Sequence, residues 1–408
     1  MWQKLKNIYH FVSAFFANLY YRFPTRNLKV IGVTGTDGKT TVVHLIYEIL
    51  KQAGKKVAMV SSVKAEVDGQ EFETGLHVTT PNPWQLQKIV RRIVDRGGEY
   101  LVLEVTSHAL DQHRVFGIPF EIGVLTNVTD EHLDYHQTYE NYLATKLKLL
   151  KSAKVAVVNR EDKSYKNFQF SIFNFQLKKG LVTYGITKGD VTSHNFKFST
   201  PLQGKYNQSN CLAAIAATKQ LGIDKKMIKK AVSRFEGVIG RFEFIDTNRD
   251  FQVMIDFAHT PNAFRQVLKT IRPMVKGRLI HVFGCAGLRD KKKRPVMGEI
   301  SAQDADIIIL TEEDYRTENV NKIIKEISDG CLNKLKTQNS KLKTTTQNLK
   351  LFKITDRQRA ITKAISLAKK GDLVLLTGKG HEKSLCRGKK EYPWSEHEAV
   401  KRALRALN

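Results

Sequence analysis

Residues 34–41 read Thr-Gly-Thr-Asp-Gly-Lys-Thr-Thr. An apolar run of strand length, residues 28–33, comes immediately before them. A helical pattern follows, and its apolar face consists of Val43, Leu45, Ile46, Ile49 and Leu50. A strand, a glycine-containing loop and a helix in this order are the context in which proteins bind phosphate groups. We therefore expect residues 34–41, called the phosphate loop below, to bind a nucleotide.

The residue types in the phosphate loop indicate how it would contact the nucleotide. Glycines let backbone N–H groups turn toward phosphate oxygens, and the N-terminus of the following helix favours an anion. Lys39 would reach the β- and γ-phosphates, and the Thr40 hydroxyl would bind Mg²⁺. The general pattern G-x-x-x-x-G-K-[ST] has a glycine where this chain has Val33, and the glycines here are Gly32 and Gly35. The loop residues predicted to bind ATP are Gly35, Thr36, Asp37, Gly38, Lys39, Thr40 and Thr41.

Apolar runs of strand length, each followed by a helical pattern, recur along the chain. The first series lies at residues 28–33, 57–60, 100–105, 122–125 and 155–158. A second series, starting near Phe242, lies at residues 252–255, 278–283, 306–310 and 372–376. Such alternation is typical of parallel sheets in α/β proteins. Glu236, Gly237 and Gly240 interrupt the pattern between the two series.

We therefore predict an α/β protein made of two successive units. Residues 28–238 form a central ATPase domain with a phosphate loop on a parallel sheet, and residues 239–408 form a Rossmann-like α/β domain. Residues 1–27 precede them as an amphipathic segment. Residues 333–350 are rich in Lys, Thr, Gln and Asn and have no periodicity, so we expect a solvated loop there.

The charge of the chain indicates anionic partners. It has 67 Lys and Arg against 40 Asp and Glu, a formal net charge of +27. Nucleotides, phosphorylated substrates, nucleic acid and an anionic membrane face all suit this surplus. The four cysteines are scattered without metal-ligand spacing, as in a reduced cytosolic protein.

The N-terminal segment combines an apolar stripe with polar interruptions. Leu5, Ile8, Val12, Phe15 and Leu19 recur at three- and four-residue steps, which predicts an amphipathic helix. No apolar run reaches the roughly 18 residues expected of a spanning helix. Three alternatives stay open: a helix packed on its own domain, a helix at a membrane surface, and a partner-binding helix.

Eight motifs in one order make the chain similar to the Mur ligase family, with the closest resemblance to the members that add the third residue of the peptidoglycan stem peptide. Residues 35–41 resemble G-T-N-G-K-T-T, with Asp37 in place of Asn. Residues 104–114 read Glu-Val-Thr-Ser-His-Ala-Leu-Asp-Gln-His-Arg and resemble E-V-S-S-H-x-L-x-Q-x-R. The other matching segments are 79–81, 126–136, 240–243, 256–261, 284–295 and 378–382.

The resemblance implies an ATP-dependent ligase that activates a muramyl-peptide carboxylate as an acyl phosphate and couples it to an amino acid. A carboxylate and a triphosphate are both anions, so metal ions and cationic side chains must gather where they meet. The resemblance assigns the catalytic role to Lys39, Glu104, His132 and Lys146. It also assigns Mg²⁺ ligation to Thr40, Glu104, His132 and a carbamylated Lys146.

Further substrate contacts are implied by the same resemblance. Adenine and ribose would be bound by Asn207, Asn210, Arg241 and Asp256, although Asn210 equally suits an N-cap. The muramyl-peptide acceptor would be bound by Thr79, Thr80, Ser107, Gln112 and Arg114. The incoming amino acid would be bound by Arg289, Arg316, Gly378 and Glu382. Members that add diaminopimelate carry D-N-P-R where residues 313–316 read Glu-Asp-Tyr-Arg, so Arg316 favours diaminopimelate and lysine stays open.

Full-length members of the resembled group have a first domain that holds the uridine nucleotide, and we expect this chain to lack it. A lipid-linked or non-uridylylated acceptor, met at a membrane by residues 1–26, is the hypothesis that follows. In all other respects we expect a cytoplasmic monomer that uses ATP and Mg²⁺.

Two alternative functions have their own signatures. A folylpolyglutamate-synthase-like ligase would share the phosphate loop, but segments 104–114 and 378–382 disfavour it. A basic nucleic-acid-binding ATPase would carry aromatic residues interleaved with basic ones on a strand face, and the sequence has no such pattern. We therefore expect no nucleic-acid partner.

Overall fold

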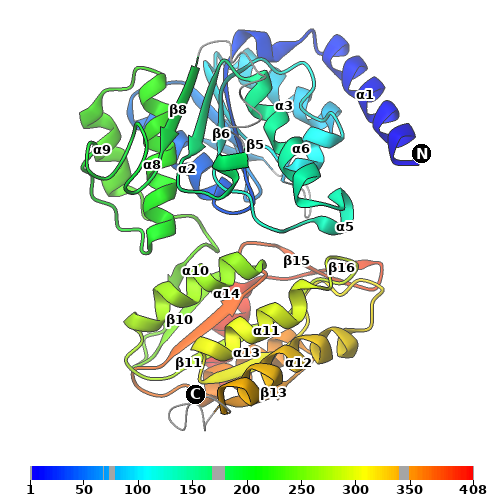
Figure 1. Cartoon of the computed structure of the whole chain (residues 1–408), viewed down its shortest axis with the longest axis vertical. Helices are drawn as coiled ribbons and strands as arrows, with labels where there is room; N and C mark the ends of the chain where they lie inside the picture. The colour runs from blue at the N-terminus through cyan, green and yellow to red at the C-terminus, as the bar shows by residue number, and fades with distance from the viewer. Residues whose placement is uncertain (1, 68, 73–78, 168–179, 340–348, 408) are drawn as a thin grey trace. The chain divides into compact units, whose positions relative to one another are not determined.

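The computed structural model describes residues 2–67, 69–72, 79–167, 180–339 and 349–407. The chain divides into two compact units, Met1–Glu236 and Gly237–Asn408 (Figure 1). Each unit is a sheet with helices on both faces, so the predicted α/β class is confirmed. Within the described ranges, no helix is both long and apolar enough to cross a membrane.

The first unit contains an eight-stranded sheet in the order β4-β3-β2-β5-β1-β6-β7-β8. Six neighbouring strands are parallel, and the edge strands β3 and β4 are antiparallel. The strands are β1 (Lys29–Thr34), β2 (Val57–Val60), β3 (Ala65–Val67), β4 (Gln70–Phe72), β5 (Tyr100–Glu104), β6 (Phe120–Leu125), β7 (Val155–Asn159) and β8 (Gly180–Tyr184). Because β1 is central, with β5 and β6 on its two sides, the carboxyl ends of these three strands meet beside the phosphate loop.

Helices cover both faces of this sheet. Apolar side chains of α3 (Pro83–Asp95) and α6 (Tyr139–Ser152) pack on one face, and α2 (Lys39–Gln52) and α8 (Lys205–Gln220) cover the other. The other helical segments are α1 (Trp2–Tyr20), η1 (Pro24–Asn27), α4 (Ser107–Asp111), α5 (Leu133–His136) and α9 (Lys225–Arg234). The central strands β1, β2, β5 and β6 are buried on both sides, which explains their continuous apolar runs.

The second unit has a six-stranded sheet in the order β13-β12-β11-β14-β10-β9. Only the edge strand β9 (Glu243–Ile245) is antiparallel among these strands. The others are β10 (Gln252–Asp256), β11 (Leu279–Phe283), β12 (Ile307–Leu310), β13 (Lys350–Lys353) and β14 (Leu373–Thr377), and β15 (Ser384–Arg387) pairs with β16 (Lys390–Pro393) as a separate hairpin.

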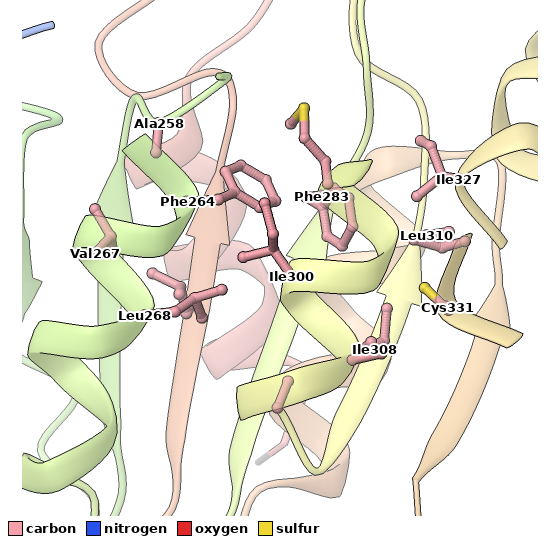
Figure 2. Packing of buried hydrophobic residues seen from close by; sticks show 14 of the residues in the cluster. Ala258, Phe264, Val267, Leu268, Phe283, Ile300, Ile308, Leu310, Ile327 and Cys331 are labelled. Atoms are coloured by element: carbon pink, nitrogen blue, oxygen red, sulfur yellow. The ribbon is translucent and has the colours of Figure 1, made fainter. Parts of the chain in front are cut away.

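Two apolar cores enclose the second sheet. Helices α10 (Pro261–Ile271), α11 (Lys293–Asp304) and α12 (Val320–Asn339) pack on one face. Figure 2 shows Phe264 of α10, Phe283 of β11 and Ile300 of α11 meeting in that core. Helices α13 (Arg357–Leu367) and α14 (Glu396–Arg405) pack on the other face, and η2 (Arg272–Met274) follows α10.

The sequence pattern located the buried strands, but it was wrong at one predicted loop. Residues 333–339 belong to α12, not to a solvated loop, and because they are mostly polar no apolar periodicity signals the helix there. Strand β13 begins at Lys350, and residues 340–348 lie outside the described residues. The assignment of functional domains to residues 1–27, 28–238 and 239–408 stays a prediction.

Candidate active site

The phosphate loop bends at two glycines whose backbone angles suit no other residue well. Gly35 has φ +149°, and a Cβ there would lie 1.8 Å from the Thr126 hydroxyl oxygen. Gly38 has φ +82° and caps the N-terminus of α2. Val33 is still within β1, where it pairs with Glu104, so the bend begins after it. This explains why the chain has no glycine at position 33.

Asn127 and Thr126, at the end of β6, hold the phosphate loop in shape. The Thr36 N–H donates to the Asn127 carbonyl at 2.8 Å, and the Asp37 N–H donates to Asn127 Oδ1 at 2.9 Å. The Thr126 hydroxyl and the Asn127 amide both donate to the Asp37 carbonyl. These contacts engage the N–H groups of Thr36 and Asp37, while α2 presents its first turn from Lys39 onward.

Thr40 and Glu104 bring two potential oxygen ligands for a metal ion together beside the loop. Thr40 Oγ1 lies 3.1 Å from Glu104 Oε1, and the Ser62 N–H donates to Glu104 Oε2 at 3.0 Å. Both side chains are buried. Among the described residues, no group of three or more His, Cys, Asp or Glu has the geometry of a metal site. A hydroxyl and one carboxylate still suit Mg²⁺, which commonly completes its shell with substrate phosphates and water.

Lys146 of α6 is fully buried against the phosphate loop. Its Nζ donates to the Gly35 carbonyl at 2.7 Å and lies 4.3 Å from the centre of the Tyr142 ring. Burial, and then the charge of Lys39, hold the pKa of Lys146 well below its usual value. Lys39 itself donates to the Thr36 carbonyl at 3.0 Å. The structure therefore places two of the predicted catalytic residues, Lys39 and Lys146, on backbone carbonyls of one loop.

His132 lies near Tyr142, at the end of the loop before α5. Its backbone is left-handed, with φ +56°. Its ring lies edge-on to His108 at 4.9 Å and is 6.1 Å from the Tyr142 ring. Tyr142 is therefore a neighbour of both His132 and Lys146, and its hydroxyl is 3.3 Å from Thr36 Oγ1.

Asn210 adjoins the phosphate loop from α8. A Cβ at Gly38 would lie 2.3 Å from Asn210 Oδ1. Asn210 also donates to Asn207 Oδ1 at 3.2 Å, and Asn207 donates to the Gln203 carbonyl. Helix α8 begins at Lys205, so Asn210 lies inside the helix and the alternative interpretation as an N-cap is wrong.

Four of the five residues predicted to bind the acceptor lie near the carboxyl end of β5. The Thr80 hydroxyl donates to the Glu104 carbonyl at 2.9 Å, and the Thr80 carbonyl accepts from Arg114 at 2.8 Å. Arg114 also donates twice to Gln112 Oε1. Ser107 Oγ is 3.0 Å from His136 Nε2. Thr79 is next to this group in sequence and half-buried.

In the second unit, the predicted nucleotide residues Arg241 and Asp256 adjoin the segment that contains Gly378. Asp256 accepts from the Phe242 and Ala258 N–H groups at 2.7 Å each. The Arg241 guanidinium lies 4.2 Å from the centre of the Phe257 ring. A Cβ at Gly240 would lie 2.4 Å from the His381 nitrogen, so segments 240–242 and 378–382 are in close contact.

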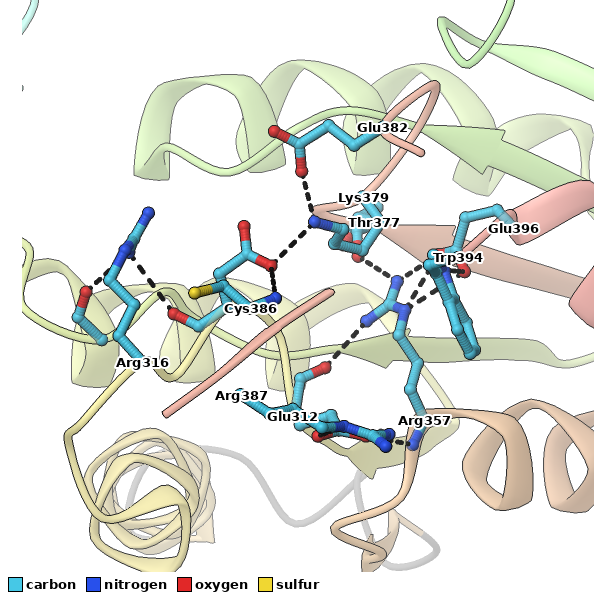
Figure 3. Close-up of polar contacts among 12 residues, drawn as sticks. Glu312, Arg316, Arg357, Thr377, Lys379, Glu382, Cys386, Arg387, Trp394 and Glu396 are labelled. Carbon is cyan, nitrogen blue, oxygen red and sulfur yellow. Dashed lines mark hydrogen bonds and ion pairs between the residues drawn. The ribbon is translucent and has the colours of Figure 1, made fainter. Parts of the chain in front are cut away.

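Lys379 organises the predicted amino-acid site, although it was not predicted. It is fully buried, donates to Asp314 at 2.9 Å and pairs with Glu382 (Figure 3). Glu313 next to it is buried, and burial followed by the charge of Asp314 raises the pKa of Glu313 to about 7. A Cβ at Gly378 would lie 2.8 Å from Glu313 Oε2.

The two arginines predicted to bind the amino acid lie beside one loop. Arg316 has a left-handed backbone, with φ +52°, and donates to the Gly287 carbonyl at 2.8 Å. Arg289 is exposed in the loop that follows β11. Arg316 therefore contacts the loop that contains Arg289.

Two further ion pairs in this unit escaped prediction from the sequence. Arg357 pairs with Glu396, and Arg387 pairs with Glu312 (Figure 3). The first pair is fully buried, and Arg357 also donates to the Thr377 carbonyl at 2.8 Å. Arginine and glutamate 39 and 75 positions apart give no local pattern. Only an unusual charge within an apolar helical face, as at Arg357, could have signalled such a pair.

Comparison with known proteins places this geometry in a family. A family model described as the Mur ligase middle domain matches residues 33–218, and one described as Mur ligase, glutamate ligase domain matches residues 240–380. A UDP-N-acetylmuramoyl-L-alanyl-D-glutamate--2,6-diaminopimelate ligase of Clostridium acetobutylicum is 37% identical over 95% of this chain and 80% of its own length. A UDP-N-acetylmuramyl-tripeptide synthetase of Borreliella burgdorferi is 37% identical over 98% of this chain and 81% of its own. A solved diaminopimelate ligase structure of the first kind is 30% identical with TM-score 0.60, covering 93% of this chain and 79% of that one.

Proposed function

The chain belongs to the Mur ligase family, and on that premise we propose that it joins the carboxylate of a muramyl-peptide to an amino acid in peptidoglycan precursor synthesis, with release of ADP and phosphate. The observation that carries this proposal is the set of groups around one loop. Lys39 and Lys146 bring amines, and Thr40 and Glu104 bring oxygen donors, to residues 35–40. Carboxylate activation needs cations and metal ligands at this kind of place.

The residues divide the reaction into binding and activation. The first turn of α2 and Lys39 would bind the triphosphate, and Arg114 would orient the anionic acceptor near the end of β5. The acceptor carboxylate would attack the γ-phosphorus, which forms an acyl phosphate and releases ADP. The amine of the amino acid would then attack the acyl carbon, which forms the amide and releases phosphate. Mg²⁺ held by Thr40, Glu104 and His132 would neutralise charge between the two anions.

Lys146 would contribute as a carbamate. Its uncharged amine would attack CO₂, a nitrogen–carbon bond would form, and one proton would pass to solvent. The product is an anion, which suits a metal site better than an ammonium group. The support is the position of Nζ, which is buried within hydrogen-bond distance of Gly35. Lysine side chains are almost never fully buried unless they have a partner, so the enclosed position of Lys146 distinguishes it from an ordinary surface lysine.

The amino acid would be bound in the second unit. Arg316 and Arg289 suit a carboxylate, and Glu382, positioned by Lys379, suits an ammonium group. Such a set fits a diamino acid with a distal carboxylate. Diaminopimelate is therefore the favoured substrate, and lysine is the alternative because Asn and Pro of D-N-P-R are replaced in this chain.

The cellular setting is also part of the proposal. We propose a cytoplasmic monomer that touches a membrane peripherally through residues 1–26. All four cysteines are free thiols and buried, which agrees with a reducing compartment.

Ligation can be tested with ATP, Mg²⁺ and a panel of muramyl-dipeptide acceptors, with and without UDP, against diaminopimelate and lysine. We expect phosphate release that depends on both the acceptor and the amino acid. The Lys39→Ala variant should lose at least about 100-fold in turnover, because it removes charge stabilisation at the transferred phosphoryl group. The absence of amino-acid-dependent release with every acceptor would refute the ligase proposal.

The same assay separates the alternatives. A folylpolyglutamate-synthase-like enzyme would release phosphate with a folate acceptor and glutamate. A nucleic-acid-binding ATPase would hydrolyse ATP faster with a polynucleotide and without any acceptor.

A further inference from the structure

Helix α1 presents most of its large apolar side chains away from its own domain. The side chains buried on its inner face, Ala14, Ala17 and Asn18, are small or polar, and Phe11 lies beside them. Its outer face consists of Ile8, Tyr9, Val12, Phe15, Phe16, Leu19 and Tyr20, which are 41–71% exposed. A helix packed on a soluble domain normally has the opposite arrangement. Something other than unit Met1–Glu236 must therefore cover the outer face if its apolar area is to leave water.

The inner face holds α1 firmly despite its polarity. Asn18 donates to the Phe116 carbonyl at 2.9 Å and to the Ala14 carbonyl at 2.8 Å. Phe11 packs edge-on against Phe116, with ring centres 4.8 Å apart. The contact is close, since a Cβ at Gly117 would lie 2.8 Å from Asn18 Oδ1. The exposed outer face is thus not the result of a loosely attached helix.

The segment that α1 holds is the one predicted to bind the acceptor. Residues 107–117, called the acceptor segment, include Gln112 and Arg114. Asn7 of α1 donates to Asp111 Oδ2 at 3.1 Å, and the Tyr135 hydroxyl donates to the same oxygen at 2.8 Å. Phe11 also lies 5.6 Å from the His113 ring. The inner face of α1 and the acceptor segment are therefore one packed element.

The chemistry of the outer face matches a lipid surface. Tyr9 and Tyr20 lie on the outer face, and Tyr20 is 5.8 Å from the exposed Trp84 ring of α3. Tyrosine and tryptophan are enriched where a bilayer meets water. Helix α1 contains no acidic residue, and Lys6 and Arg22 lie near its two ends. A second copy of a chain with net charge +27 would be repelled, whereas anionic headgroups would be attracted.

We propose that α1 lies on an anionic lipid surface through its outer face and holds the acceptor segment there, so that the acceptor is a lipid-linked muramyl-peptide. The choice of acceptor rests on the proposed ligase function, but the docking of α1 does not. The apolar side chains enter the headgroup boundary, and the cations at the ends of the helix remain among the headgroups. The acceptor segment then faces a substrate that shares the same surface.

Vesicle binding by the full chain tests the docking. The wild type should sediment with vesicles of phosphatidylcholine and phosphatidylglycerol, and binding should weaken with phosphatidylcholine alone. Replacing Phe15, Phe16 and Leu19 by serine should weaken binding at least about 100-fold, because three large apolar side chains no longer leave water. A matched variant replaces Met274, Leu332 and Leu407 by serine. These side chains are 41–43% exposed in the second unit, and the variant should bind vesicles like the wild type.

Three outcomes would overturn the docking proposal. The wild type fails to bind anionic vesicles, or the Phe15, Phe16, Leu19 variant binds as well as the wild type. In the third outcome, light scattering without vesicles shows a dimer that this variant converts to a monomer, which would assign the outer face to a second copy. Equal thermal unfolding midpoints of the variants exclude misfolding as the cause of lost binding.

Turnover separates the docking proposal from the ligase proposal. With a water-soluble acceptor, both variants should match the wild type, since the replaced side chains lie outside the predicted site. With a lipid-linked acceptor in vesicles, the Phe15, Phe16, Leu19 variant should lose turnover about as much as it loses binding. Vesicle binding without ligation of any acceptor would refute the function only. Ligation of the soluble acceptor, with no preference for the lipid-linked one, would refute the acceptor assignment only.

Discussion

Lys146 shows how much a single buried residue can indicate. It belongs to a helix with other lysines, and its spacing in the sequence does not distinguish it from them. In the structure its amine is enclosed, contacts the Gly35 carbonyl and lies over the Tyr142 ring. Burying an amine costs free energy that its hydrogen bond to Gly35 offsets only in part, and such buried groups cluster at functional sites, so this position supports a functional role.

A carbamate on Lys146 can be observed directly. After exchange into ¹³C-labelled bicarbonate, we expect one carbamate carbonyl signal in the NMR spectrum of the wild type. Lys146→Arg should lose that signal and turnover by about 100-fold or more, because a guanidinium cannot form the carbamate and would bring a cation to the metal site. Lys151→Arg, on the exposed part of the same helix, should keep both. A signal that persists in Lys146→Arg would contradict the assignment.

Glu313 predicts a pH dependence of stability. Its folded-state pKa is raised from 4.5 to about 7, so the unfolded chain releases this proton at lower pH than the folded chain does. Between about pH 4.5 and pH 7, the folded state therefore loses stability as pH rises, by about 3 kcal/mol in total from this group. Glu313→Gln should remove that loss and be more stable than the wild type at pH 7.

Denaturant unfolding of the full chain at pH 4.5, 6 and 7.5 measures this effect. Glu299→Gln serves as the control, because Glu299 is exposed in the same unit. The free energy of unfolding of this variant should depend on pH as that of the wild type does. Parallel pH profiles for wild type and Glu313→Gln would show that Glu313 ionises normally in the fold.

At the scale of elements, α1 and the acceptor segment illustrate how packing can reverse a pattern. The apolar stripe at three- and four-residue steps correctly predicts a helix, and it says nothing about which face meets the domain. The structure places Asn18 and two alanines inward, because hydrogen bonds to the chain at 116 compensate for burying an amide. Close approach there requires Gly117.

Gly117→Ala should loosen α1. Gly117 has φ +77°, and the added methyl would collide with Asn18. We expect a loss of about 2–4 kcal/mol, the sum of backbone strain and overpacking, with faster hydrogen exchange in Trp2–Tyr20. Gly54→Ala is a matched control, since φ is +72° and no atom lies within 4 Å of the added methyl. It should cost only the strain, about 1–2 kcal/mol. Equal losses for the two variants would show that α1 is not tightly packed on Gly117.

At the scale of the whole molecule, the charge surplus and the two units matter most. The net charge of +27 acts over distance on anionic substrates, whereas pairs such as Arg357 with Glu396 are buried and local. Salt screens the first effect strongly and the second weakly. The candidate site residues are divided between the two units, with the phosphate loop in one and Arg316 and Glu382 in the other.

Raising NaCl from about 0.05 to 0.5 M should raise the KM for ATP several-fold and leave kcat nearly unchanged, because screening reduces the attraction that concentrates the anion. The KM for the amino acid, which carries charges of both signs, should change less and serves as the internal control. If the two KM values rise together, the salt acts on the fold and not through the charge surplus.

The local sequence determined the elements of this protein. Continuous apolar runs predicted the buried parallel strands, and the phosphate loop was predicted because strand, glycines and helix are adjacent in the chain. Edge strands such as β3, β4 and β9 escaped prediction, since they are three residues long and partly polar. Residues 333–339 of α12 were predicted as a loop because they are mostly polar and show no apolar periodicity.

Only the tertiary structure decided the neighbours of each functional group. Glu104 meets Thr40 from 64 positions away, and Lys146 meets Gly35 from 111 positions away, because β5 and β6 flank β1. Strand order depends on which packing buries most apolar area, and no single strand encodes that order. The same reason explains Lys379 with Asp314 and the outward face of α1. Local periodicity specifies helices and strands, and long-range packing assembles them into a site.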